Sequence, residues 1–105
     1  MHRTLIVARM KPGRAEQVAD AFTASDRTEL PQLLGVSART LFSFHDLYFH
    51  LIESKVDLRP GLAEVRKHPL FTDINMRLAE HIDPYDPDWR GPQDAMAQEF
   101  YRWSA

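Results

Sequence analysis

The 105-residue chain contains no cysteine, which excludes a disulfide framework and a thiol nucleophile. The lack of cysteine also suits a reducing compartment, so we expect a cytoplasmic protein. No apolar run approaches the roughly 18 residues of a membrane span, and MHRTLIVARM is too short and too interrupted for a signal peptide. The formal net charge is −2 and no basic stripe is present. We therefore expect neither a membrane nor a nucleic acid as a partner.

Several catalytic signatures are also missing. His2, His68 and His81 form no HxH or HExxH spacing, so we expect no metal site. The chain has no glycine-rich phosphate loop, no GxSxG elbow and no nucleotide fingerprint, so we expect no cofactor. A catalyst built on this chain would work by acid-base and electrostatic means alone. The length predicts a single domain, residues 1–105, with a modest core that a partner subunit would stabilise.

The first third of the chain alternates between strand and helix patterns. TLIVARM, residues 4–10, is short and aliphatic and ends at Lys-Pro-Gly, which predicts a buried strand. From Ala15 onward, Val18 and Phe22 recur at helical spacing and predict a helix. This helix is interrupted in SDRTELPQLLG, where we expect Asp26 to cap a new turn with Glu29 three residues later, and Gly35 to end it.

Residues 36–53 predict a hairpin whose loop is His45-Asp46. Leu41 then lies opposite His50, and Arg39 lies opposite Ile52. One face of the hairpin carries Arg39, Leu41, Ser43, Tyr48, His50 and Ile52. The other face carries Ala38, Thr40, Phe42, Phe44, Leu47, Phe49 and Leu51. Because the second face is far more apolar, we expect it to pack on the helices. A slip of one residue would exchange the faces for one strand.

The second half of the chain predicts a broken helical region, a loop and a last strand. Asp57 is a suitable N-cap and Pro69 forces a break, while Leu70, Ile74 and Leu78 mark the buried stripe. The proline-rich residues 83–94 predict a long loop. AMAQEFYRWS, residues 95–104, alternates well enough to predict a final strand.

The predicted order is βαββαβ, which is the α+β, ferredoxin-like arrangement with one four-stranded antiparallel sheet and helices on one face. The face carrying Arg39, Tyr48 and His50 would remain bare in a monomer. Two such sheets paired across a two-fold axis would cover both faces and enclose a cavity. We therefore predict a homodimer that forms a dimeric α/β barrel.

His50 and Arg39 are the strongest catalytic candidates. A single strand histidine is more often structural, but Arg39 is expected diagonally nearby on the same face. Histidine can exchange a proton near pH 6.5, and arginine stays charged and can stabilise an oxyanion. His45 belongs to the turn. Capping is the simpler explanation for Ser25 and Asp26.

Five segments together resemble the tetracenomycin-type aromatic polyketide cyclases, and the resemblance covers essentially the whole chain. They are TELP at 28–31, FHDLYFHLIE at 44–53, HPLF at 68–71, DPYDPDW at 83–89 and EFYRW at 99–103. The resemblance implies a homodimeric ferredoxin-like barrel that binds a polyketide intermediate. It also implies intramolecular aldol condensation of a late ring, with loss of water and without cofactor or metal, in antibiotic or spore-pigment biosynthesis.

The pocket arginine and strand histidine of this family fall on Arg39 and His50. The family histidine at the position of Ser25 is absent, whereas the aspartate that follows it matches Asp26. Serine can hydrogen-bond a phenol or carbonyl but cannot replace an imidazole near neutral pH. We therefore expect His50 to shuttle the proton and Arg39 to stabilise the oxyanion. The expected substrate-binding residues are Ser25, Asp26, Leu41, Ser43, Tyr48 and Ile52.

Two other functions fit the same fold. A cofactor-free anthrone-type monooxygenase would consume oxygen as it forms a quinone. A non-catalytic polyketide-binding dimer would bind a ligand without changing its spectrum over time.

Overall fold

The computed structural model describes residues 1–90 and 92–105, so Gly91 of the predicted loop lies outside the described residues. The elements are β1 His2–Met10, α1 Ala15–Asp26, α2 Leu30–Leu34, β2 Val36–Phe44, β3 Leu47–Ser54, α3 Leu58–Val65, α4 Pro69–Ala79, β4 Ile82–Pro84 and the 3-10 helix η1 Pro92–Ala95. The strands form one antiparallel sheet in the order β2-β3-β1-β4. This order confirms the predicted α+β, ferredoxin-like fold.

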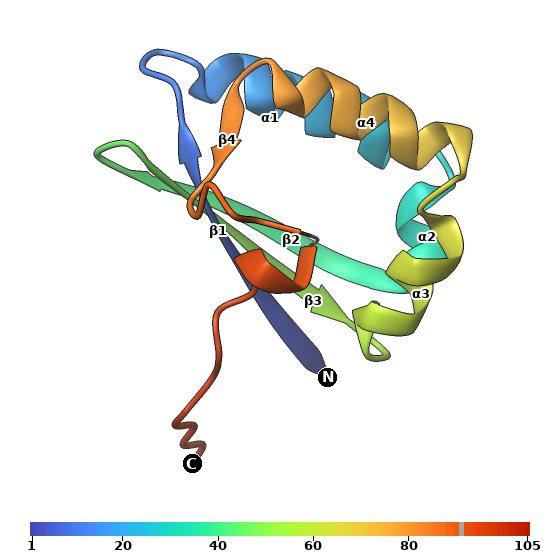
Figure 1. The fold of residues 1–105 in the computed structure, drawn as a ribbon. Coiled ribbons are helices and arrows are strands. Elements are labelled where there is room, and N and C mark those ends of the chain that lie inside the picture. Colours follow the sequence, from blue (N-terminus) through green and yellow to red (C-terminus); the bar gives the residue numbers. More distant parts are fainter. Residues whose placement is uncertain (91) are drawn as a thin grey trace.

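Helices α1 and α4 run side by side over one face of the sheet (Figure 1). They bury Val18 and Phe22 of α1 and Ile74 of α4 against Ala8 of β1. Leu70 and Leu78 pack against the same core, so the predicted stripe of α4 is confirmed. Removal of these apolar side chains from water supplies most of the favourable free energy of folding.

The helix ends follow local chemistry, with one exception. Asp57 caps α3 by accepting a hydrogen bond from the Arg59 backbone at 3.1 Å, and Gly35 ends α2 with a φ of 72°. The predicted cap at Asp26 is wrong, because α1 continues through Asp26 itself. Thr28 Oγ1 instead accepts a hydrogen bond from Leu30 N at 3.2 Å where α2 begins. This frees the Asp26 carboxylate for another partner.

The register of the β2–β3 hairpin is as predicted. Leu41 pairs with His50 and Arg39 pairs with Ile52 across the strands. The loop residue His45 has a φ of 55°, the left-handed conformation that such a tight loop requires. A register irregularity is confined to the start of β2, between Val36 and Ala38.

The predicted orientation of the hairpin is wrong. Tyr48, His50 and Ile52 are only 4%, 6% and 6% exposed and face the helices, whereas Phe42 and Phe44 are 53% and 63% exposed on the opposite face. The prediction assumed that the helices cover the more apolar face of the hairpin. In the structure they cover the other face. The cavity expected between two sheets therefore cannot be formed by the face that carries His50.

The predicted last strand is also wrong. The fourth strand is β4, which pairs with Ala8, Arg9 and Met10 of β1, and its Pro84 suits an edge position. Residues 95–104 form one bridge between Ile6 and Met96, and Ala97 N donates to Leu5 O at 2.8 Å. Beyond this point the segment extends away from the sheet and leaves Phe100 96% exposed (Figure 1). Alternating aromatic residues formed no strand here because the single chain offers them no surface to pack on.

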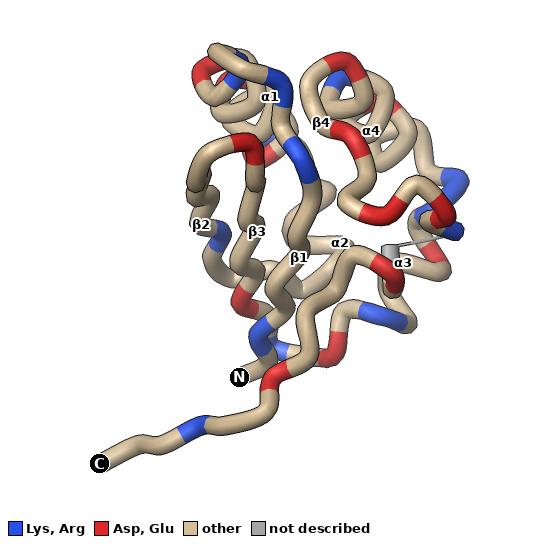
Figure 2. The backbone as a smooth tube through the Cα atoms, turned by 60° about the vertical axis from the view of Figure 1, so that its left-hand side comes forward, with Lys and Arg blue, Asp and Glu red and all other residues tan. Residues whose placement is uncertain are grey.

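Acidic and basic residues are interspersed along the described backbone (Figure 2). No helix within residues 1–90 and 92–105 is long and apolar enough to cross a membrane.

Candidate functional site

A charged pair links the end of α1 to the edge strand β2. Arg39 Nη2 lies 2.7 Å from Asp26 Oδ1, and Arg39 Nε lies 3.2 and 3.1 Å from the two carboxylate oxygens. The Arg39 side chain is 15% exposed and that of Asp26 is 39% exposed. Several charge-assisted hydrogen bonds to one carboxylate fix the guanidinium plane as well as its charge. Asp26, whose carboxylate does not cap a helix, therefore positions Arg39.

Arg39 also contacts His50, as the sequence predicted. Its Nη1 lies 2.9 Å from His50 Nε2. Because arginine can only donate, Nε2 must accept, and the ring proton of His50 resides on Nδ1. Burial lowers the pKa of His50 to about 3, and the neighbouring Arg39 charge lowers it in the same direction. The imidazole is thus neutral near neutral pH.

Phe22 of α1 lies against both of these side chains. The Cζ atom of Arg39 lies 4.7 Å from the centre of the Phe22 ring, and the His50 ring centre lies 4.9 Å away in an edge-on arrangement. A guanidinium over an aromatic face is stabilised by about 0.5–2 kcal/mol, depending on its desolvation. Phe22 therefore holds Arg39 and shields His50 from water.

Tyr48 adds a phenol next to His50, with the two ring centres 6.1 Å apart. Burial raises the pKa of Tyr48, and the positive charge of Arg39 opposes this shift. The hydroxyl consequently stays protonated and can donate a hydrogen bond. Within the described residues, Tyr48 Oη and His50 Nδ1 make no hydrogen bond to the protein, yet no fully enclosed side-chain nitrogen or oxygen lacks a partner. Both atoms therefore keep some accessible surface and an unused hydrogen-bonding capacity.

The remaining predicted residues are Leu41, Ile52, Ser43 and Ser25. Leu41 is half-buried and packs against the core, and Ile52 is buried on the same face. Ser43 is exposed near the hairpin loop, and Ser25 lines a separate pocket between α1 and α4. The structure thus brings together Asp26, Arg39, His50 and Tyr48. Ser43 lies directly across from Tyr48 on β2 but is exposed, and Ser25 lines the other pocket.

Sequence reasoning assigned Phe22 only to the helical core. The signal that could have revealed its second role is its spacing, because residues four apart on a helix share a face. Phe22 and Asp26 are such a pair, and both contact Arg39.

The charged pair forms part of the wall of an open groove. Asp26 and Arg39 line this groove together with Pro31 of α2 and the start of β2, and its volume is about 280 Å³. Ligand pockets commonly begin near this size, at roughly 300 Å³. The guanidinium is therefore within reach of a molecule that enters beside β2.

In the described part of the chain, no three His, Cys, Asp or Glu side chains come together to hold a metal ion.

Comparisons with known proteins identify the family of the chain. Residues 2–104 match the family model described as polyketide synthesis cyclase. The chain is 48% identical to tetracenomycin F2 cyclase of Streptomyces glaucescens over 99% of this chain and 95% of that protein. It is 47% identical to polyketide synthase CurG of Streptomyces cyaneus, with 98% and 97% of the two chains covered. An uncharacterized protein of Streptomyces coelicolor is 52% identical, with 98% and 95% covered.

Two solved structures resemble the fold. That of tetracenomycin F2 cyclase, described as a type II polyketide cyclase, superposes with a TM-score of 0.93 at 48% identity and covers 100% of this chain and 99% of that chain. A putative antibiotic biosynthesis monooxygenase from Nitrosomonas europaea gives a TM-score of 0.57 at 12% identity, with 81% and 80% covered, which indicates a shared fold alone. The match over nearly the whole length establishes that the chain belongs to the polyketide synthesis cyclase family.

Proposed function

We propose that this polyketide cyclase closes a late ring of an aromatic polyketide intermediate by intramolecular aldol condensation followed by loss of water, without a cofactor. The observation that carries the proposal is the contact of Arg39, held by Asp26, with a neutral His50. Relatives named tetracenomycin F2 cyclase and polyketide synthase CurG support a role in type II polyketide biosynthesis.

The reaction makes demands that this site can meet. A methylene between two carbonyl groups is already acidic, so the protein mainly has to hold the chain in a reactive shape and stabilise developing negative charge. The guanidinium of Arg39 is fixed in orientation and can face an enolate or alkoxide oxygen. The enolate carbon then forms a bond to the second carbonyl carbon, and the resulting alkoxide takes up a proton equivalent to the one that the methylene lost. The new hydroxyl leaves as water together with a second hydrogen of the former methylene carbon.

The environment of His50 changes the role first expected for it. A pKa of about 3 makes His50 a poor base near neutral pH, and its Nε2 lone pair already accepts from Arg39. The atom that remains for the substrate is the Nδ1–H donor. We therefore assign His50 to hydrogen-bonding of the carbonyl oxygen that is attacked, with the Tyr48 hydroxyl as a second donor. Neutral donors suffice because the substrate methylene is itself acidic.

The walls of the site favour a flat, largely apolar substrate. Phe22, Tyr48 and Ile52 are buried around the polar groups, and Leu41 is half-buried beside them. Such walls would fold a flexible chain into one conformation and exclude water from competing ring closures.

We also propose that the protein is a homodimer formed through the sheet face that the helices leave uncovered. Val7, Phe49 and Phe42 are cross-strand neighbours on this face, and Phe42 is 53% exposed. An exposed aromatic side chain beside half-buried apolar neighbours favours a protein–protein contact. Each subunit would then hold a complete site between its own sheet and helices.

Product analysis tests the proposed reaction. The purified protein is incubated with linear and partly cyclised aromatic polyketide intermediates, and the products are identified by mass and NMR. We expect a product that is one water lighter and contains one more ring. Oxygen consumption coupled to quinone formation would instead support a monooxygenase, and unchanged intermediates would argue for a binding protein.

A further inference from the structure

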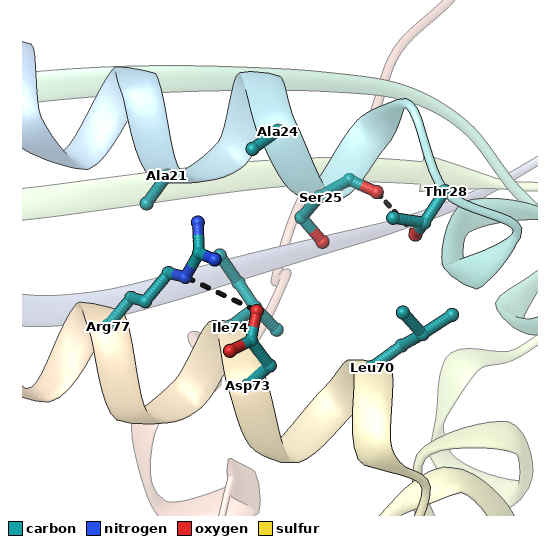
Figure 3. A pocket seen from close by; sticks show the side chains of 8 residues that line it. All are labelled: Ala21, Ala24, Ser25, Thr28, Leu70, Asp73, Ile74 and Arg77. Atoms are coloured by element: carbon teal, nitrogen blue, oxygen red, sulfur yellow. Dashed lines mark hydrogen bonds and ion pairs between the residues drawn. The ribbon is translucent and has the colours of Figure 1, made fainter.

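We propose that a small pocket between α1 and α4 is a substrate subsite that binds one hydroxyl or carbonyl group of the polyketide. This α1–α4 pocket has a volume of about 100 Å³ and is lined by Ala21, Ala24, Ser25, Ile74, Asp73 and Arg77 together with two further residues (Figure 3). The identity of the ligand rests on the proposed function, whereas the existence of a binding site does not.

The pocket is positioned to act together with the Arg39 site. Phe22 and Asp26, four residues apart, both contact Arg39, whereas Ala21 and Ser25 line the pocket. Adjacent positions on an α-helix are rotated by about 100°, so the pocket and the Arg39 site occupy neighbouring faces of the same two turns. A helix with side chains is about 10 Å across, so a substrate with a flexible arm that follows the surface of α1 can contact both places.

The charges in the pocket favour a neutral polar group. Asp73 pairs with Arg77 through Nε at 3.2 Å, so the two charges balance. The salt bridge leaves both Nη groups of Arg77 for other partners, and the guanidinium reaches toward α1 near Ala21 (Figure 3). An anion would be attracted by Arg77 but repelled by Asp73. A phenol hydroxyl or ketone can use donors and acceptors without a charge penalty.

Ser25 supplies a further hydrogen-bonding group on the opposite wall. Its hydroxyl points into the space between the helices, while its backbone carbonyl accepts a hydrogen bond from Thr28 Oγ1 at 2.6 Å (Figure 3). The inner wall is apolar, since Ala21 and Ile74 are 8% and 6% exposed. The hydroxyl is therefore a polar group beside an apolar wall, which is the usual composition of a specific subsite.

The size of the pocket limits what can enter. A volume of about 100 Å³ equals the share of about three water molecules at roughly 30 Å³ each. One oxygenated substituent, or the edge of one ring, fits this space, but a fused ring system does not. We infer that the α1–α4 pocket reads one end of the substrate while the reacting carbons lie beside Arg39.

Binding of a small probe tests the pocket without any turnover. The probe is 2′-hydroxyacetophenone, which carries a phenol and a ketone side by side, titrated into the ¹⁵N-labelled full chain. We expect amide shift changes at Ala24, Ser25 and Arg77. Ala24→Leu fills the pocket and should weaken binding at least tenfold, whereas Ala19→Leu makes the same change at an exposed position of α1 and should bind normally. Equal binding by both variants, or no shifts at the pocket, would overturn the proposal.

A second measurement links the pocket to substrate choice. With the polyketide intermediate that gives product, Ala24→Leu should raise KM or change the position of the closed ring, and Ala19→Leu should do neither. An unchanged KM and product with Ala24→Leu would reject a substrate subsite. If the probe binds at the pocket but no intermediate is cyclised, the binding site stands and the proposed function is rejected.

Discussion

Arg39 donates a hydrogen bond from Nη1 to Nε2 of His50 across 2.9 Å, and this contact determines which histidine nitrogen carries the proton. Asp26 holds the other side of the same guanidinium. The three side chains come from α1, β2 and β3, so the arrangement exists only in the folded chain. Burial, assisted by the charge of Arg39, lowers the pKa of His50 and makes the imidazole a neutral donor.

The buried neutral His50 predicts a pH dependence of stability. Between about pH 3 and pH 6.5, unfolded His50 binds a proton that folded His50 does not, so the free energy of unfolding rises with pH across this window. One such group contributes up to about 1.4 kcal/mol per pH unit. Urea unfolding of the wild type and His50→Gln at several pH values checks this. Relative to the variant, the wild type should lose stability as pH falls from 6.5 toward 4; parallel curves would contradict it.

Replacement of Phe22 should weaken catalysis more than folding. Phe22→Leu keeps an apolar side chain but removes the aromatic face beneath Arg39, so kcat should fall about 2- to 30-fold, the factor equivalent to the cation–π stabilisation. KM should change little. In an Arg39→Met background, Phe22→Leu should no longer lower kcat. Phe71→Leu, on a half-buried phenylalanine of α4, is the matched control. Equal losses of kcat in Phe22→Leu and Phe71→Leu would mean that Phe22 acts only as a core residue.

The proposed homodimer predicts a mass of twice 12.2 kDa in solution. Phe42→Ser combined with Phe44→Ser removes the exposed aromatic side chains from the uncovered sheet face and should yield a monomer. Met76→Ser, at an exposed apolar position on α4, should leave the dimer intact. Light scattering after size-exclusion chromatography measures all three masses. A wild-type monomer, or a double variant that remains dimeric, would count against this interface.

The sequence was sufficient to predict the order of the elements before the last strand, and the hairpin register. A period of two along each strand and a two-residue loop leave few ways to pair β2 with β3, and the pairing of Leu41 with His50 followed directly. The contact between Arg39 and His50 was a consequence of that register.

The sequence was not sufficient to predict which face the helices cover. Phe42 and Phe44 make one face the more apolar, and a count of apolar residues cannot distinguish a core from an exposed apolar surface. The face that packs on the helices carries the charge of Arg39, which Asp26 of α1 neutralises from thirteen residues earlier in the chain. An ion pair between two such distant positions leaves no periodic pattern in the sequence. The last strand was misplaced for a related reason, since the aromatic residues of the C-terminal segment lack a surface within the chain.

Arg39 is proposed to stabilise the negative charge that develops during ring closure. The most direct test of this role is the rate of cyclised product formation by the wild type, Arg39→Met and Arg66→Met, where Arg66 is an exposed arginine at the end of α3. Circular dichroism and mass in solution verify that all three are folded alike. We expect Arg39→Met to be slower by about 10²-fold, as for loss of one oxyanion donor, or to close a mixture of rings, while Arg66→Met behaves as the wild type. An unchanged rate and product with Arg39→Met would contradict the account.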